Sequence, residues 1–347
     1  MKLIKTVDAV GHVLCHDMTQ IIPEGEKRYK GPRFRKGHVV TQEDVPVLLG
    51  MGKVNLYVWE MTPGMLHEDE AAHRLAALCL GEGTAVAGEP SEGKIMIEAA
   101  CDGVFMLDSE RLIAVNSFDE VMVATRKGNF GVRRGDKLAG TRVIPLVVKE
   151  EVLKAAEAAA ADEPLMCVKP YVLKTAAIIA TGSEVKQGLI DDRFTPVMRA
   201  KLESFGVETV VKAKPGDEMD DIVAAIHDAV ERNVDLVLCT GGMSVDPDDN
   251  TPGSIKRAGA RIVTYGAPVL PGAMMLLGYL DGRDGKQVPV LGVPGCAMYN
   301  KATVLDLVLP RIVAGVELTK RDFQVLGEGG MCLGCPTCTY PVCPFGK

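Results

Sequence analysis

The sequence predicts an α/β protein whose C-terminal half is a three-layer domain with a parallel β-sheet, preceded by a β-rich α+β accessory region. In the second half, mostly apolar strand candidates alternate with single helices, which is typical of a parallel sheet with helices on both faces. In the first half, short β-rich runs alternate with turn-like segments. An Ala/Glu-rich helix between Lys149 and Pro164 separates these two patterns. We therefore expect an accessory region at residues 1–150, the sheet domain at 165–326 and a cysteine-rich tail at 327–347.

The composition is that of a globular protein and argues against several classes of partner. Of 347 residues, 47% are apolar and 24% are charged, and the net charge is -7. This charge gives no general attraction to nucleic acid or to an anionic membrane, so neither is an expected partner. The first residues lack a signal-peptide core, which predicts a cytoplasmic location. The uncharged stretch Ile262–Leu280 is interrupted by glycines and prolines, which predicts buried strand and turn rather than a membrane span.

In the first half, the predicted elements are short helices and antiparallel strands. A helix that opens at Thr41 precedes the strand Lys53–Trp59, in which polar and apolar residues alternate. The one longer helix is His67–Leu80. Further β-rich runs are separated by the turn-like sequences CDG, DSE and NSFD, which predicts an antiparallel sheet. These strand candidates are Lys94–Ala99, Gly103–Leu107, Leu112–Val115 and Glu120–Ala124.

In the second half, the hydrophobic pattern alternates between strands and helices. The predicted helices are residues 196–205, 218–232 and 300–313. The predicted strands are Thr175–Ala180, Val207–Lys212, Asp235–Cys239, Arg261–Thr264 and Val288–Gly292. Ligands of parallel sheets bind at the carboxyl ends of the strands, so the loops that follow these strands are the candidate site.

Four such loops are short and rich in glycine, hydroxyl or carboxylate groups. They are Thr181–Glu184, Gly216–Asp217, Thr240–Ser244 with its continuation to Pro252, and Pro294–Gly295. A single loop of this kind is ordinarily a turn, but four on one edge indicate backbone donors for a phosphate together with carboxylates for Mg²⁺. The sequence has no GxGxxG after a strand, no GxxxxGK[ST] and no GxSxG, which argues against a Rossmann cofactor, a P-loop and a serine hydrolase.

The order and spacing of these motifs resemble the molybdopterin-binding domain, which molybdopterin adenylyltransferases, molybdopterin molybdotransferases and gephyrin share. The resemblance covers about Lys174 to Pro310. Its most specific part is the pair Gly241-Gly242 followed by Asp-x-Thr-Pro at residues 249–252. The motifs that carry it are TGSEV, GDEMDDIVAAI, TGGMSVDPDDNTP, the turn at Pro271-Gly272, and LGVPG.

The resemblance assigns roles to individual residues. It implies that Glu184, Asp217 and Asp249 are the catalytic acidic set, which holds Mg²⁺ or positions molybdate and the adenylated intermediate. It implies that molybdopterin or adenylated molybdopterin is bound by Thr181, Gly182, Ser183, Gly241, Gly242, Ser244, Thr251, Pro294 and Gly295. A phosphate beside carboxylates needs a cation or backbone dipoles to offset the repulsion, which these loops would supply.

Two features decide between branches of the family. The N-terminal segments AVGHVLCHDM and GVRRGDKLAG resemble accessory parts of the molybdotransferases, which favours a transferase that inserts molybdenum or tungsten. The family's lysine-containing KPGKP turn corresponds to APVLPGAMM, and its GLPGNP to GVPGCAMYN, so the lysines that complement the oxyanion are missing. This favours the alternative, a non-catalytic carrier or sensor of the cofactor. A molybdoenzyme or an adenylyltransferase is the candidate protein partner, and a homo-oligomer is expected.

The tail carries a metal-ligand pattern. Cys332, Cys335, Cys338 and Cys343 have the spacing C-x2-C-x2-C-x4-C, followed by proline. This spacing is close to that of the bacterial ferredoxin run, which predicts an Fe–S cluster, and four thiolates can equally bind Zn²⁺. Free thiols or a disulfide are the remaining alternative. The preceding GEGG predicts a flexible hinge, from which we expect the body to bind pterin without the tail.

Overall fold

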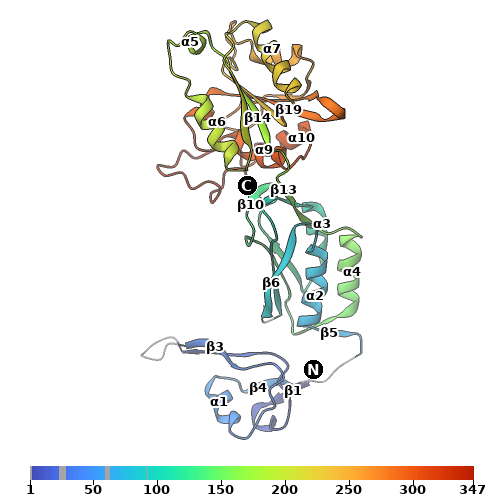
Figure 1. Cartoon of the computed structure of the whole chain (residues 1–347). Helices are drawn as coiled ribbons and strands as arrows, with labels where there is room; N and C mark the ends of the chain where they lie inside the picture. Colours follow the sequence, from blue (N-terminus) through green and yellow to red (C-terminus); the bar gives the residue numbers. More distant parts are fainter. Residues whose placement is uncertain (1, 23–28, 59–62, 92) are drawn as a thin grey trace. The chain divides into compact units, whose positions relative to one another are not determined.

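The computed structural model describes residues 2–22, 29–58, 63–91 and 93–347, which form two compact units (Figure 1). The first unit contains the residues up to 100 together with 107–126 and 134–167. The second contains residues 101–106, 127–133 and 168–347. The chain therefore passes between the units more than once.

The first unit is built from antiparallel strands and short helices, as the sequence predicts. Near the N-terminus, β1 (Lys2–Lys5) pairs with β4 (Asn55–Val58), and β2 (Met18–Ile22) pairs with β3 (Tyr29–Phe34), beside α1 (Asp44–Gly50). Trp59, the predicted end of β4, lies outside the described residues.

A four-stranded antiparallel sheet, in the order β6-β7-β11-β9, forms the other part of this unit. Helix α2 (Glu68–Cys79) packs against β7 and β11. The strands are β6 (Thr84–Ser91), β7 (Lys94–Ala99), β9 (Val121–Thr125) and β11 (Lys137–Val143). The remaining elements are β5 (Met65–His67), which pairs with β12 (Val147–Lys149), and the helices α3 (Ser109–Val115) and α4 (Glu150–Ala160).

The predicted strand Leu112–Val115 is wrong, because these residues lie in helix α3. Asp108 caps the helix, and its carboxylate accepts a hydrogen bond from Arg111 N at 3.0 Å. The cap satisfies a backbone donor that a strand would have left for a neighbouring strand. Four apolar residues in a row are too few to distinguish the two periodicities.

The second unit contains a six-stranded sheet in the order β15-β14-β16-β19-β18-β17. Strands β15, β14, β16 and β19 run parallel, as predicted. Strand β18 is antiparallel to both of its neighbours, so the sheet is mixed rather than wholly parallel. A short turn joins β18 to β19, and so short a connection permits only antiparallel pairing. The strands are β14 (Thr175–Ala180), β15 (Glu208–Ala213), β16 (Leu236–Thr240), β17 (Arg261–Tyr265), β18 (Leu276–Asp281) and β19 (Gln287–Val293).

Helices cover both faces of this sheet, which gives the three predicted layers (Figure 1). Successive residues of β14 alternate between the two faces: Ile178 belongs to the core under one helical layer and Ile179 to the core under the other. The first layer contains α6 (Phe194–Glu203), α9 (Val304–Val313) and α10 (Lys320–Gln324). The second contains α7 (Met219–Glu231) and α8 (Thr251–Arg257). Strand β10 (Phe130–Val132) packs against α9, and it pairs with β8 (Gly103–Leu107) in a small sheet that also contains β13 (Met166–Pro170).

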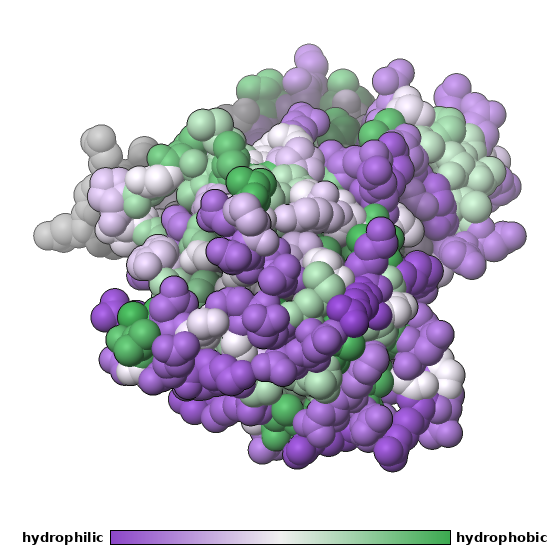
Figure 2. Space-filling view, turned by 90° about the horizontal axis from the view of Figure 1, so that it is seen from above, coloured by the Kyte–Doolittle hydropathy of each residue, from purple (hydrophilic) through white to green (hydrophobic). Residues whose placement is uncertain are grey.

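The stretch Ile262–Leu280 forms parts of β17 and β18 and the turn between them, in agreement with its interpretation as buried strand and turn. Leu276 and Leu277 are almost fully buried there. No helix within the described ranges is long and apolar enough to cross a membrane. On the face shown in Figure 2, hydrophilic residues predominate and hydrophobic residues form small separate patches.

The tail packs against the sheet domain. The backbone of Leu270 donates to Gly330 O and accepts from Cys332 N, both at 2.8 Å. Phe345 is 2% exposed and belongs to the core that contains α9. The predicted flexible hinge at GEGG is therefore wrong: a Cβ on Gly330 would lie 2.6 Å from Pro268 O, so this glycine permits close packing rather than free movement.

Candidate functional site

An open pocket of about 940 Å³ lies where the parallel strands β14, β15, β16 and β19 end. Three of the four loops named from the sequence contribute residues to the lining. The fourth, Pro294–Gly295, contributes only through the residues that follow it. Asp217 follows β15, and Met298 and Tyr299 follow β19. The residues of the sequence-derived set that line the pocket are Thr181, Gly182, Glu184, Asp217, Gly241, Gly242 and Asp249. The sequence therefore located this edge of the sheet.

The two glycine loops approach each other closely at the base of the pocket. Thr181 Oγ1 lies 3.2 Å from Thr251 Oγ1, and Thr181 Oγ1 donates to Thr240 O at 3.1 Å. A Cβ on Gly241 would lie 2.6 Å from Thr181 O, and φ of Gly241 is +90°. Glycine is thus required at this position by the contact between loops as well as by the backbone conformation.

Asp217 organises the pocket through its hydrogen bonds. Its Oδ2 accepts from Ser183 N at 2.7 Å, and its backbone carbonyl accepts from Asn250 Nδ2 at 2.9 Å. One residue therefore ties together the loops that follow β14, β15 and β16. Because an oxygen of Asp217 is already used, this side chain has less capacity for a ligand than the sequence suggested.

Several sequence-derived residues are absent from the described lining. Thr251 is fully buried and supports Thr181, and Ser183 uses its backbone amide on Asp217. Ser244 is exposed. Those that do not line the pocket are Ser183, Ser244, Thr251, Pro294 and Gly295.

The charge of the pocket is the feature that sequence reasoning missed. Arg193 is the one cation among the described lining residues, which also include seven carboxylates. These are Glu184, Asp191, Asp192, Asp217, Asp246, Asp248 and Asp249. The charged run Asp-Asp-Arg at 191–193 could have indicated this charge. It follows the first glycine loop and has no regular hydrophobic pattern. A bare phosphate would be repelled here, so an anionic ligand needs an accompanying cation.

Asp192 is committed to the structure. Thr195 donates to its carboxylate from N at 2.9 Å and from Oγ1 at 2.6 Å, at the start of α6. Burial alone raises the pKa of Asp192, but these hydrogen bonds and the Lys214 ammonium outweigh it, so the pKa lies below its usual range. Asp192 is therefore a charged carboxylate near neutral pH.

Asp249 offers the clearest free ligand atom. Its Oδ2 is buried, and in the described structure it has no hydrogen-bond partner. Carboxylate oxygens are the preferred ligands of Mg²⁺, which commonly binds one or two carboxylates and completes its shell with water and phosphate. No group of three or more candidate metal ligands is gathered within the described residues, which is compatible with such a sparse protein contribution. The residues present therefore fit Mg²⁺ bound together with a phosphate.

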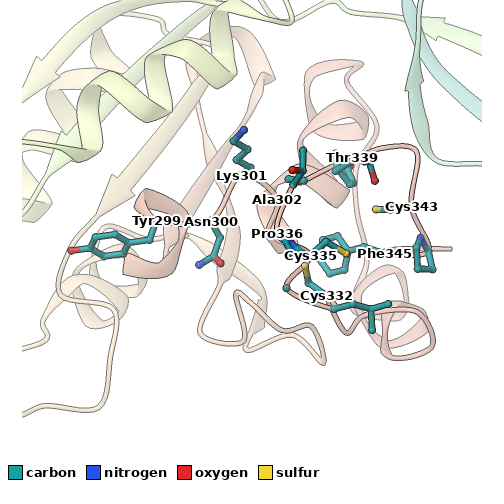
Figure 3. Close-up of a pocket in the computed structure, with 16 residues that line it drawn as sticks. Tyr299, Asn300, Lys301, Ala302, Cys332, Cys335, Pro336, Thr339, Cys343 and Phe345 are labelled. Atoms are coloured by element: carbon teal, nitrogen blue, oxygen red, sulfur yellow. The ribbon is translucent and has the colours of Figure 1, made fainter.

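The four tail cysteines line a second pocket, of about 400 Å³ (Figure 3). All four thiols are free of disulfides. Cys332 and Cys343 are half-buried, whereas Cys335 and Cys338 are exposed. The sequence therefore identified a set of thiols that the fold places around one space.

Comparison with known families agrees with this geometry. Residues 177–314 match the family described as "Probable molybdopterin binding domain". Residues 3–60 match a domain family of unknown function.

Curated relatives match the domain over short segments. Molybdopterin molybdenumtransferase of Staphylococcus aureus strain COL is 29% identical over 123 residues, which are 33% of this chain and 29% of the relative. A CinA-like protein of Desulfosudis oleivorans is 37% identical over 83 residues, which are 24% of this chain and 20% of the relative. The chain thus spans less than a third of the length of these relatives.

Solved structures also align with the domain. The molybdopterin biosynthesis enzyme MoaB of Thermus thermophilus aligns at 20% identity with a TM-score of 0.33, covering 41% of this chain and 98% of that chain. The tungsten cofactor synthesizing protein MoaB of Pyrococcus furiosus aligns at 18% identity with a TM-score of 0.32, covering 40% and 88%.

Proposed function

We propose that this chain, whose residues 177–314 form a domain of the molybdopterin-binding family, binds molybdopterin or adenylated molybdopterin in the acidic pocket and acts in assembly of the molybdenum or tungsten cofactor. The finer proposal is a transferase that resembles the molybdotransferases and inserts the metal oxyanion into the adenylated pterin. The observation that carries the proposal is the pocket at the ends of the parallel strands, whose lining includes both glycine loops and Asp249, a residue whose buried Oδ2 has no described hydrogen-bond partner.

Some residues of the pocket would contact the ligand, and others hold the loops in position. The glycine loops at Gly182 and Gly241-Gly242 line the pocket, and their backbone amides would be the donors to a phosphate. The contact between Thr181 and Thr251 fixes the separation of these loops. Asp217 holds the first loop in place through Ser183 N. The pocket is therefore preorganised by bonds within the chain before a ligand arrives.

Mg²⁺ is the cation that the carboxylates would recruit, with Asp249 and Glu184 as the protein ligands. When bound, Mg²⁺ neutralises the charge of a pyrophosphate and of a developing phosphate leaving group. Arg193 would contact the anionic ligand directly from the segment before α6. In this arrangement, the protein would provide the carboxylates that bind Mg²⁺ and one positive charge, on Arg193, that contacts the ligand.

A carrier or sensor of the finished cofactor is the second candidate. The specific observation that favours it is the charge count, since Arg193 is the one described cation in a lining with seven carboxylates. The turn at Leu270, where the resembling family has lysines, instead pairs with the tail. With only one described cation in the lining to complement a dianion, we expect molybdate insertion to be weak.

One experiment tests the function and separates the two candidates. Adenylated molybdopterin is titrated into the full chain with and without Mg²⁺, and AMP release is then followed on addition of molybdate. Mg²⁺-dependent binding supports pterin recognition, and molybdate-dependent AMP release supports the transferase. Binding without AMP release selects the carrier. If no binding occurs in either condition, the proposed function is wrong.

A further inference from the structure

Two sets of hydrogen bonds place the four tail cysteines around one pocket. Cys332 is fixed to the domain, because its backbone amide donates to Leu270 O at 2.8 Å. The longer gap between Cys338 and Cys343 contains a tight turn, in which Val342 N donates to Thr339 O at 2.7 Å and Thr339 Oγ1 donates to Val342 O at 3.0 Å. This turn shortens the four-residue gap, so Cys343 returns to the same pocket as the other thiols.

The pocket is held by contacts that do not involve the cysteines. Tyr340 Oη donates to Asp306 O at 2.9 Å, on helix α9. Phe345 is buried in the core, and Lys347 Nζ lies 5.3 Å from the centre of the Phe130 ring. The walls are therefore part of the packed domain, and the two exposed thiols, on Cys335 and Cys338, lie on the loop that encloses the space.

We propose that the thiolates of Cys332, Cys335, Cys338 and Cys343 bind one [4Fe–4S] cluster in this pocket. The spacing provides three ligands at intervals of three residues, which is the local arrangement of a cysteine-rich cluster loop. Each cysteine binds one iron as a thiolate and releases its thiol proton to solvent. The binding itself needs no change of oxidation state in the protein.

The separation of the four thiols favours a cluster over a single zinc ion. Four sulfurs at about 2.3 Å from one Zn²⁺ must lie roughly 3.8 Å from one another. In the described structure, no three candidate ligands are gathered for one ion, although all four thiols line a pocket of about 400 Å³. A cluster meets its ligands at four separate corners, and it therefore accepts thiols that are further apart than a single ion does.

The cluster site adjoins the acidic pocket through one short segment. Tyr299 lines both pockets, Met298 lines the acidic one, and Asn300 to Ala302 line the cysteine one. Figure 3 shows Tyr299 directed away from the cysteines, whereas Ala302 lies beside the tail. Cluster binding would restrict the movement of residues 298–302. Met298 and Tyr299 in this segment line the acidic pocket, so that part of its wall would also be restricted. This step rests on the proposed function, and it makes pterin affinity depend on the occupancy of the tail.

The first test measures metal content in the full chain purified without oxygen. We expect about four iron and four sulfide per chain, and visible absorbance that dithionite bleaches. Cys335→Ala, which removes an exposed thiol, should lose most of the iron, whereas Cys296→Ala, a half-buried cysteine outside both linings, should retain it. One zinc per chain without iron would overturn the cluster, and trace amounts of both metals would overturn the metal site.

The second test measures pterin affinity in the same proteins. Couplings between sites usually change affinity by about 5- to 150-fold, so Cys335→Ala should bind adenylated molybdopterin at least about fivefold more weakly than Cys296→Ala. Equal affinities would overturn the coupling and leave the cluster in place. If none of the proteins binds pterin, although wild type and Cys296→Ala still contain iron, the proposed function is rejected and the cluster is not. Truncation of the tail is unsuitable here, because it also removes the buried Phe345.

Discussion

Arg311 and Asp322 form an ion pair in which Nη1 lies 2.7 Å from Oδ1, and the Arg311 side chain is only 3% exposed. The pair joins α9 to the start of α10. Asp322 also accepts from Thr319 N at 2.8 Å and from Thr319 Oγ1 at 2.7 Å. A buried guanidinium thus depends on one carboxylate that also caps the next helix.

This pair predicts a loss of stability in acid. Burial alone raises the pKa of Asp322, but the hydrogen bonds from Thr319 and the charge of Arg311 outweigh it, so the pKa lies below its usual range. Burial lowers the pKa of Arg311, yet the guanidinium remains protonated throughout the acid range, so Asp322 sets the pH dependence. Because its folded pKa is depressed, the stabilisation is fully present above the unfolded value of about 3.9 and is lost as pH falls through the folded value.

Asp322→Asn should reduce the free energy of unfolding by about 2 kcal/mol at pH 7, and the difference from wild type should shrink below about pH 4. Urea unfolding at a series of pH values measures both effects. Asp228→Asn, on an exposed i,i+4 pair with Arg232, is the control and should cost at most about 0.5 kcal/mol. A pH-independent difference for Asp322→Asn would contradict the assignment.

Gly241→Ala should destabilise the pocket loops. The new Cβ would lie 2.6 Å from Thr181 O and 2.7 Å from Thr181 Oγ1, so the loops must move apart. We expect a loss of about 2–3 kcal/mol in thermal or urea unfolding, together with weaker pterin binding. Gly206→Ala is a matched control, because Gly206 also has a positive φ, of +74°, but a Cβ added there would have no other atom within 4 Å. It should cost about 1 kcal/mol and leave binding unchanged; equal effects at both sites would mean that backbone conformation alone is responsible.

Asp249→Asn should weaken the Mg²⁺-dependent part of pterin binding while the fold survives. The substitution removes the negative charge of the carboxylate whose Oδ2 has no described partner, and it leaves the size of the side chain almost unchanged. We expect at least tenfold weaker binding with Mg²⁺ and little change without it, measured by titration calorimetry. The control is Asp228→Asn, outside the lining. Undiminished Mg²⁺-dependent binding would move the cation site to another carboxylate.

Arg193→Gln should lower affinity for the anionic ligand both with and without Mg²⁺. Arg193 is the one described cation of the lining, so its charge is not duplicated within the pocket. We expect a five- to tenfold loss that diminishes at high salt, because the interaction is exposed and screened. Arg199→Gln, within helix α6, paired with Glu203 and outside the lining, controls for net charge. If both variants lose affinity equally, the effect is one of overall charge.

The sheet and the edge that carries the acidic pocket could be predicted from the sequence, because buried parallel strands and glycine loops have a local pattern. Strand β14 and its face alternation at Ile178 and Ile179 follow directly from an apolar run. The reversed direction of β18 did not follow, since it depends on a short turn rather than on the strand itself. Arg193 was missed because a residue in an irregular segment reaches the pocket only through tertiary folding. Tail docking at Leu270 is likewise a long-range pairing with no local signal.

The assembly of the second unit from separated stretches affects how the gene can be divided. Phe130 belongs to the core beneath α9, yet it lies 38 positions before Val168, where the long stretch of this unit begins. An expression fragment that starts near residue 165 would encode the sheet, the pocket and the tail, but would leave a vacancy in the packing where Phe130 belongs. The domain cannot be transplanted as one uninterrupted cassette: a chimera must carry residues 101–106 and 127–133 along with it.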